Sequence, residues 1–243
     1  MSTGRSPLPL WVSIPMSLLV LGACWIFMTP TLSTPRSHVW RNQTLNNLRG
    51  VGIAVHTYAT KFDGWIPPGG SPADRLPQWS WETQLLPYLD QEALFRSIDF
   101  TRPWNAPENA KMFATNLRFL QSPAESDRQS ADGFAVTHFT ANSRVFGART
   151  GVRLDDVSKG DGLSMTLMMG EIGSAFPPWG QPGNTRDPAR GLGGGPDQFG
   201  NARRDVCAVV FLGGNSRFLS PDTSPQVLLL IADSDNGIPD DDF

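Results

Sequence analysis

The residue types that serine-hydrolase chemistry needs all occur in this 243-residue sequence, but they do not form a known motif. Such an enzyme requires a nucleophile, a base and an orienting acid within hydrogen-bond reach, and Ser164, His138 and Asp161 supply these types. The residues around the serine, Gly162-Leu163-Ser164-Met165, are not a nucleophile elbow. We interpret Asp161 and Ser164 as turn and cap residues before a strand, and we expect no enzyme.

Oxygen-bearing residues near the carboxyl end resemble the start of a calcium loop. The run Asp233-Ser234-Asp235-Asn236-Gly237 makes Asp233, Asp235 and Asn236 metal-ligand candidates, with a glycine for the sharp turn. The bidentate glutamate of such a loop would fall beyond Phe243, so we favour a solvated acidic tail over a calcium site. No other cofactor is expected, because CxxC is absent and the three histidines have no partner at ligand spacing.

Two other polar residues are expected to have structural roles. Glu171 ends an apolar run, and an unpaired buried carboxylate is costly, so we expect an arginine or backbone N–H groups to meet it. His56 lies on the flank of an apolar helical stripe with no second histidine nearby. We therefore expect a half-buried, hydrogen-bonded histidine rather than a catalytic one.

Composition limits the classes of protein to consider. The net charge of -3 and the scattered arginines provide no basic surface for nucleic acid. The chain contains 24 glycines and 21 prolines without a three-residue period, which favours a loop-rich domain that contains β-structure. Its length suits a membrane segment followed by one globular domain.

The membrane segment is predicted at residues 10–28, 19 residues without a charge. At 1.5 Å per residue a helix of this length is about 28 Å long, close to the hydrocarbon thickness of a bilayer. We favour an uncleaved anchor. The alternative is a lipoprotein in which Cys24 is acylated after cleavage, although the apolar run continues beyond this cysteine. Cys24 and Cys207 would be separated by the membrane interface, so no disulfide is expected.

A long helix is predicted at residues 36–62, because apolar residues recur at steps of three and four. The stripe consists of Leu45, Leu48, Gly52, Val55, Ala59 and Phe62. Gly50 and Gly52 lower helix propensity, so we expect a sheet or a neighbouring subunit to approach closely there. Asp63-Gly64 should end the helix.

The remaining elements suggest an α+β domain. Short helices are predicted at residues 80–99, split at Pro87, and at 109–116, with a further helix at 224–232. Strands are predicted at residues 117–120, 134–141, 164–171, 205–214 and 215–220. Residues 172–204, rich in glycine and proline, are expected to form a long, flexible surface loop that exposes Trp179.

Taken in order, these motifs resemble the domain of unknown function 1559 (DUF1559) family, whose members are prepilin-like exported proteins expanded in planctomycete bacteria. The residues that carry the resemblance between about 30 and 232 include Asn46, Asn47, Gly52, His56, Tyr58, Pro68, Trp81, Pro87, Tyr88, Trp104, Asp161, Gly162 and Glu171. The resemblance implies a cytoplasmic amino terminus and one membrane helix that continues into an exported helix. It further implies a pilin-like fold, in which this helix packs on an antiparallel sheet. Pseudopilins also use calcium near the carboxyl end.

The sequence departs from the family pattern in three places. The prepilin peptidase site is replaced by Gly4-Arg5-Ser6-Pro7-Leu8, and no glutamate precedes Glu82. The late histidine and Asp-Gly of the family fall on Arg203 and Gly213-Gly214. The cysteines of the family are absent near Thr44 and near residues 121–122.

We therefore predict a single-pass protein of the cytoplasmic membrane with a structural or adhesive role. Residues 1–33 would form the anchor, 34–64 the spine helix, 65–233 the exported domain and 234–243 an acidic tail. Its partners would be the membrane and other subunits of a pilus-like or secretion assembly. The alternative is an anchored ligand-binding module that uses the 172–204 loop and Trp179 as its contact surface.

Overall fold

The computed structural model describes residues 36–70, 79–147, 151–201 and 205–234. The chain divides into two compact units, Met1–Val39 and Trp40–Phe243, and the elements below belong to the second from Trp40 onward. Within the described ranges no helix combines the length and the apolar character that crossing a bilayer requires. The predicted membrane segment at residues 10–28, with Cys24, lies outside these ranges.

The long helix predicted at residues 36–62 is confirmed as α2, Arg36–Lys61. Leu48, Val51 and Val55 are fully buried along one face of α2, whereas Ile53 on the opposite face is 62% exposed. The helix ends at the predicted place, where Asp63 and Gly64 have φ angles of 50° and 84°. The N–H of Gly64 donates to the carbonyl of Ala59 over 2.9 Å, so the positive φ values close the last turn.

The described strands form a five-stranded sheet in the order β3-β1-β2-β4-β5. The strands are β1 Phe139–Asn142, β2 Leu167–Glu171, β3 Thr185–Arg186, β4 Cys207–Phe211 and β5 Ser216–Leu219. β2 pairs antiparallel with β1 and β4, and β5 pairs antiparallel with β4. β3 runs parallel to β1, so the sheet is mixed and the expectation of an antiparallel sheet was wrong.

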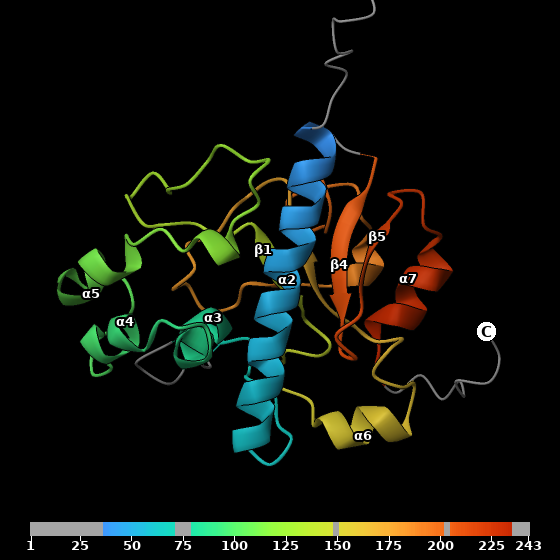
Figure 1. Ribbon diagram of the computed structural model, residues 1–243, viewed down its shortest axis with the longest axis horizontal. Helices are drawn as coiled ribbons and strands as arrows, with labels where there is room; N and C mark the ends of the chain where they lie inside the picture. Colours follow the sequence, from blue (N-terminus) through green and yellow to red (C-terminus); the bar gives the residue numbers. More distant parts are fainter. Residues whose placement is uncertain (1–35, 71–78, 148–150, 202–204, 235–243) are drawn as a thin grey trace, which may run out of the picture. The chain divides into compact units, whose positions relative to one another are not determined.

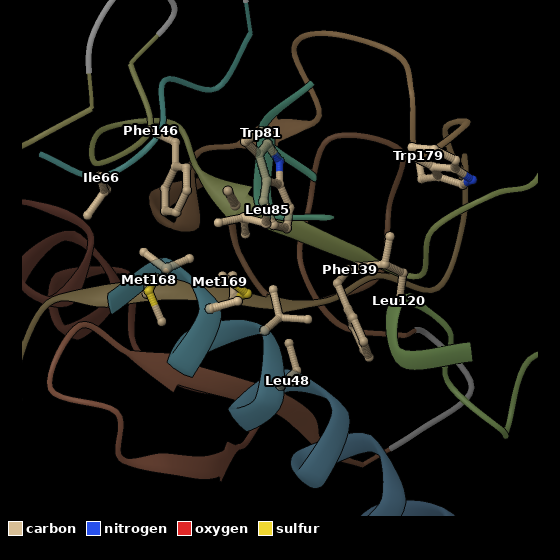
Figure 2. Packing of buried hydrophobic residues seen from close by; sticks show 14 of the residues in the cluster. Leu48, Ile66, Trp81, Leu85, Leu120, Phe139, Phe146, Met168, Met169 and Trp179 are labelled. Carbon is tan, nitrogen blue, oxygen red and sulfur yellow. The ribbon is translucent and has the colours of Figure 1, made fainter. Parts of the chain in front are cut away.

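α2 packs on one face of this sheet. The pairs Ala141–Met169 and Met169–Val210 are in register, so these three side chains share a face. They belong to one buried cluster with Leu48 of α2, and Figure 2 shows Leu48 pointing towards Met169 and Phe139. In Figure 1 α2 runs in front of the strands, with α3 to α5 on one side and β4, β5 and α7 on the other.

The other face of the sheet has its own apolar cluster. Leu167, Val209 and Phe211 pack there with Leu228 and Ile231 of α7, Pro225–Ala232. The Ser224 side chain accepts a hydrogen bond from the Val227 N–H, so it caps α7 as a Ser-Pro start predicts. Both faces of the central strands are thus covered.

Short helices make up the rest of the described structure. They are α3 Trp81–Leu85, η1 Leu86–Tyr88, α4 Glu92–Ser97, α5 Pro107–Phe113, η2 Arg118–Leu120, α6 Leu154–Lys159 and η3 Pro188–Arg190. The break at Pro87 is confirmed. Residues 118–120 form a single 3-10 turn instead of the predicted strand, while β3 and α6 were not predicted.

The described part of the glycine-rich segment, residues 172–201, is not the long flexible surface loop that its composition suggested. Trp179 is fully buried, and its indole N–H donates to the Thr115 carbonyl over 3.1 Å, so it provides no exposed contact surface. Leu192 and Phe199 are buried as well. The nearest neighbour of Gly180 is the Phe113 ring, which a Cβ would strike, so this glycine allows a close approach.

Candidate functional site

Asn47, the second residue of the Asn-Asn-Leu motif, holds α2 to η2. Its amide nitrogen donates to the carbonyls of Arg118 and Gln121 over 3.1 and 2.9 Å. Its amide oxygen accepts a hydrogen bond from Gln43 over 2.8 Å. Asn47 therefore has a positioning role, whereas its neighbour Asn46 is exposed.

His56 and Gly52 are contact residues between α2 and the sheet. The Nε2 atom of His56 is 2.6 Å from the Leu212 carbonyl, which confirms the expected half-buried, hydrogen-bonded histidine. A Cβ at Gly52 would lie 3.0 Å from Met168 Cε and 3.5 Å from Val210 Cγ2, so the sheet approaches closely there. At Gly50 a Cβ would meet nothing within 4 Å, so the sheet does not approach this glycine, and the approach of a neighbouring subunit there stays a prediction.

Aromatic motif residues lie partly in the core and partly at the surface. Trp81 is fully buried and its indole N–H donates to the Asn184 carbonyl over 2.9 Å. Trp104 packs edge-on against Phe134, with ring centroids 4.9 Å apart. Pro87 lies in the first turn of η1 and Tyr88 contacts the edge of Tyr58.

A shallow aromatic groove lies at the carboxyl end of α2. It is lined by Tyr58, Lys61, Phe62, Asp63, Trp65, Ile66, Pro68 and Gly151, around a volume of about 400 Å³. Phe62, the last residue of the predicted apolar stripe, stacks on Tyr58 with ring centroids 4.2 Å apart and is 47% exposed. The carbonyl of Pro68 accepts a weak hydrogen bond from Gln84 over 3.5 Å.

A larger cavity of about 800 Å³ lies where α2 meets the segment around η2. We call it the arginine cavity. It is lined by Gln43, Asn47, Asn116, Arg118, Phe119, Gln121, Pro123 and Arg128. These residues bring two guanidinium groups, four amides and one phenyl ring together, and none of them is acidic. A volume of this size lies in the range of small-molecule sites.

A family model matches the part of the chain that carries these motif residues. Residues 40–198, well over half of the chain, match the family described as "Protein of unknown function (DUF1559)". The chain belongs to the DUF1559 family. No curated protein and no solved structure matches it.

In this DUF1559 protein the three residue types of a serine hydrolase do not meet. Phe139 is opposite Glu171 and the Ile172 N–H donates to the His138 carbonyl, so His138 lies at the carboxyl end of β2. Ser164 lies in the turn that precedes the amino end of β2, and the five residues of β2 span about 13 Å. Gly162 instead forms a turn with φ 83°, and its carbonyl accepts from the Thr166 hydroxyl over 3.1 Å. Asp161, which is 5% exposed, directly precedes this turn.

His138 is also unsuitable as a base because both ring nitrogens are engaged. Nδ1 accepts the Ser122 N–H over 3.0 Å, which leaves Nε2 to donate to the Asp127 carbonyl over 2.7 Å. Burial, the main cause, lowers the pKa of His138 to about 4, with a contribution from the Arg128 charge. The ring is therefore neutral and structural at pH 7.

Glu171 meets a backbone donor, as expected. It is 1% exposed, and its Oε1 accepts the Ala208 N–H over 2.9 Å. Burial and then the Glu171 charge raise the pKa of the Cys207 thiol well above its usual value. Cys207 is therefore a buried, free and unreactive thiol.

The calcium candidates gain no support from the described residues. The Asp233 carboxylate is paired with Arg144, whose Nη1 is 3.2 Å from Oδ2. Asp235 and Asn236 lie outside the described residues. Within the described ranges no group of three or more histidine, cysteine or acidic side chains is placed to hold a metal.

Sequence reasoning missed two features of the site region. Arg118 was assigned to a strand, but it lies in the 3-10 turn η2 instead. Glu82 was not singled out, because an acidic residue in the first turn of a helix is ordinary. It is fully buried, bonds to the Asn184 amide, and burial raises its pKa well above the usual value.

Proposed function

We propose that this DUF1559 protein is a membrane-anchored, exported, pilin-like subunit with a structural or adhesive role. Residues 10–28 would anchor it in the cytoplasmic membrane, and α2 would be the spine that carries the sheet outside the cytoplasm. One observation supports the proposal most: a 26-residue helix that follows an apolar segment in the sequence buries one face against the sheet.

The two faces of α2 suit this role differently. Val51, Val55 and Gly52 on the inner face contact the sheet cluster. The outer face carries Asn46, Ile53 and Thr57, all exposed, and the open position at Gly50. In a helical bundle of subunits the glycine would let a neighbouring helix approach closely, and the exposed isoleucine would pack against it. We therefore propose that this face contacts other copies of the chain.

Site-directed photo-cross-linking of the full-length chain in its membrane tests assembly. A photoreactive residue replacing Ile53 should give a ladder of dimers and higher multimers. The same residue replacing Asp132, which is exposed on a turn, should give mostly monomer and serves as the matched control. Monomer alone from position 53 at native expression would contradict the proposal of assembly.

The second candidate function is that of an anchored binding module. The observation that favours it is the arginine cavity, because its lining concentrates positive charge in a chain whose net charge is -3. The buried Trp179 does not contribute to this function, so the contact surface moves from the glycine-rich segment to the region around η2. We propose no enzymatic role and no cofactor.

A further inference from the structure

We propose that the arginine cavity binds a saccharide that carries a carboxylate or sulfate group. The proposal deepens the second candidate function and does not depend on assembly, because all of the lining comes from one copy of the chain. Three properties of the cavity carry it: unpaired positive charge, amide groups with unused hydrogen-bonding capacity, and an accessible phenyl ring.

Positive charge in the cavity is not neutralised by the neighbouring acids. Arg118 is exposed and takes part in none of the described ion pairs. None of the described ion pairs joins Arg118 or Arg128 to Glu125 or Asp127, the acids that are close in sequence. An anionic group entering the cavity would thus find an available guanidinium.

Arg128 is held in place for such a contact. Its Nη1 donates to Gln121 Oε1 over 3.3 Å and to the Ser122 carbonyl over 3.2 Å. In the described hydrogen bonds its Nε and Nη2 are not used. A guanidinium fixed on one side and open on the other presents its remaining donors in the planar geometry that carboxylate and sulfate oxygens accept.

The amides of the cavity divide into structural groups and available groups. Asn47 uses both its oxygen and its nitrogen within the protein. Gln43 uses only its nitrogen, towards Asn47, and Asn116 uses only its oxygen, towards Gln121. The cavity therefore offers one amide oxygen and one amide nitrogen, which suit hydroxyl groups that both donate and accept.

Phe119 distinguishes a saccharide from a simple anion. It is half-buried and lines the same cavity as the two arginines. The face of an aromatic ring carries partial negative charge and attracts the weakly positive C–H groups on one face of a sugar ring. Free phosphate, sulfate or acetate would use the arginines but gain nothing from the phenyl ring.

Calorimetric titration of the full-length chain in detergent tests the proposal. The probes are a galacturonic acid trisaccharide, a sulfated disaccharide and the uncharged maltotriose, and light scattering records whether the chain is monomeric or assembled. We expect the cavity to bind one or both acidic saccharides and not maltotriose. If the monomeric chain binds an acidic saccharide, the saccharide proposal is supported whether or not the chain assembles.

The variants locate the site. Arg118→Ala should weaken binding of the acidic saccharide roughly tenfold to a hundredfold, the size of one charge-assisted contact. Arg102→Ala, which removes an exposed arginine outside the cavity, is the control and should change affinity less than twofold. Phe119→Ala should weaken saccharide binding about tenfold while leaving the affinity for acetate or inorganic sulfate unchanged.

Each opposite result overturns the proposal. Binding of no acidic saccharide would show that the cavity is not the proposed saccharide site. Equal binding of maltotriose would show that the cavity does not select charge. Equal losses in Arg118→Ala and Arg102→Ala would indicate general electrostatic attraction, and an unchanged Phe119→Ala would indicate an anion site without sugar recognition. Thermal unfolding of every variant would ensure that these losses come from folded protein.

Discussion

The contact between α2 and the sheet predicts different effects of substitution at two glycines that are separated by one residue. At Gly50 an added Cβ meets nothing within 4 Å, so alanine should stabilise the fold by about 1 kcal/mol through helix propensity alone. At Gly52 the same atom would lie 3.0 Å from Met168 Cε and 3.5 Å from Val210 Cγ2. The methionine must move, which offsets the gain, so Gly52→Ala should be neutral or slightly destabilising.

Substitution by leucine should distinguish the stability effects at positions 50 and 52 more clearly. Leucine at position 52 overpacks the interface between α2 and the sheet and should cost about 1–3 kcal/mol. Leucine at position 50 points into open space and should not destabilise the protein. Because Met168 takes up the strain, Met168→Ala should reduce the cost of Gly52→Leu by at least about 0.5 kcal/mol in a double-mutant cycle.

Denaturant unfolding of the detergent-solubilised chain, followed by tryptophan fluorescence, measures these differences. In thermal unfolding, a change of 1 kcal/mol in the stability of a chain of this size corresponds to a shift of about 2–4 °C in Tm. The assay is run under conditions in which the chain is monomeric, so that contacts between copies do not cover Gly50. Equal effects of leucine at positions 50 and 52 would refute the packing of α2 on the sheet.

Three further predictions concern hydrogen-bonded or buried polar groups. Asn47→Ala should lower the free energy of unfolding by about 1–2 kcal/mol, because it leaves the carbonyls of Arg118 and Gln121 without their donor. Asn46→Ala is the control and should have no effect. Equal effects of the two variants in urea unfolding would be inconsistent with the hydrogen bonds described. His138 has a pKa of about 4 in the folded protein, below its unfolded value, so its contribution to stability is complete above about pH 6.5 and is lost as the pH falls towards 4. NMR titration should show a neutral ring at pH 5.5. A charged ring at that pH would contradict the burial of His138. The pKa of Glu82 is raised, so the pH dependence is reversed: its contribution to stability is complete below about pH 4.3 and is lost as the pH rises. Glu82→Gln should therefore become increasingly more stable than the parent chain between pH 5 and 8. A constant difference in stability across this range would argue against the raised pKa of Glu82.

Much of the fold follows from local patterns in the sequence. The long helix α2, its end at Asp63-Gly64 and the Ser-Pro start of α7 depend on side-chain periodicity and caps, which are short-range properties. β2, β4 and β5 were predictable because each is a short run with strand-forming residues beside turn signals.

The elements that were missed depend on contacts between distant residues. β3 is a two-residue strand that exists because Thr185 and Arg186 lie parallel to the edge of β1, and such a partner is not encoded locally. Composition suggested a flexible loop at 172–204, yet Trp179 packs against Phe113 with ring centroids 4.5 Å apart. Here glycine marks close approaches rather than flexibility.

The arginine cavity was unpredictable for the same reason. Its lining joins Gln43 and Asn47 on α2 to residues more than 65 positions later, from Asn116 to Arg128. Asn47 was singled out by family resemblance, but its role as the anchor of η2 follows only from its hydrogen bonds. By contrast, the backbone donor for Glu171 was predictable, because the cost of burying an unpaired carboxylate applies in any fold.

Thiol labelling in intact cells tests the central claim, that the α2-borne domain is exported on a membrane anchor. Asp132→Cys places an exposed thiol on a turn, while the native Cys207 is buried and serves as an internal control. We predict that a membrane-impermeant maleimide labels position 132 without lysis, that the labelled chain sediments with membranes, and that Cys207 reacts only after denaturation. Labelling of position 132 only after lysis, or recovery of the chain in the soluble fraction, would contradict the claim.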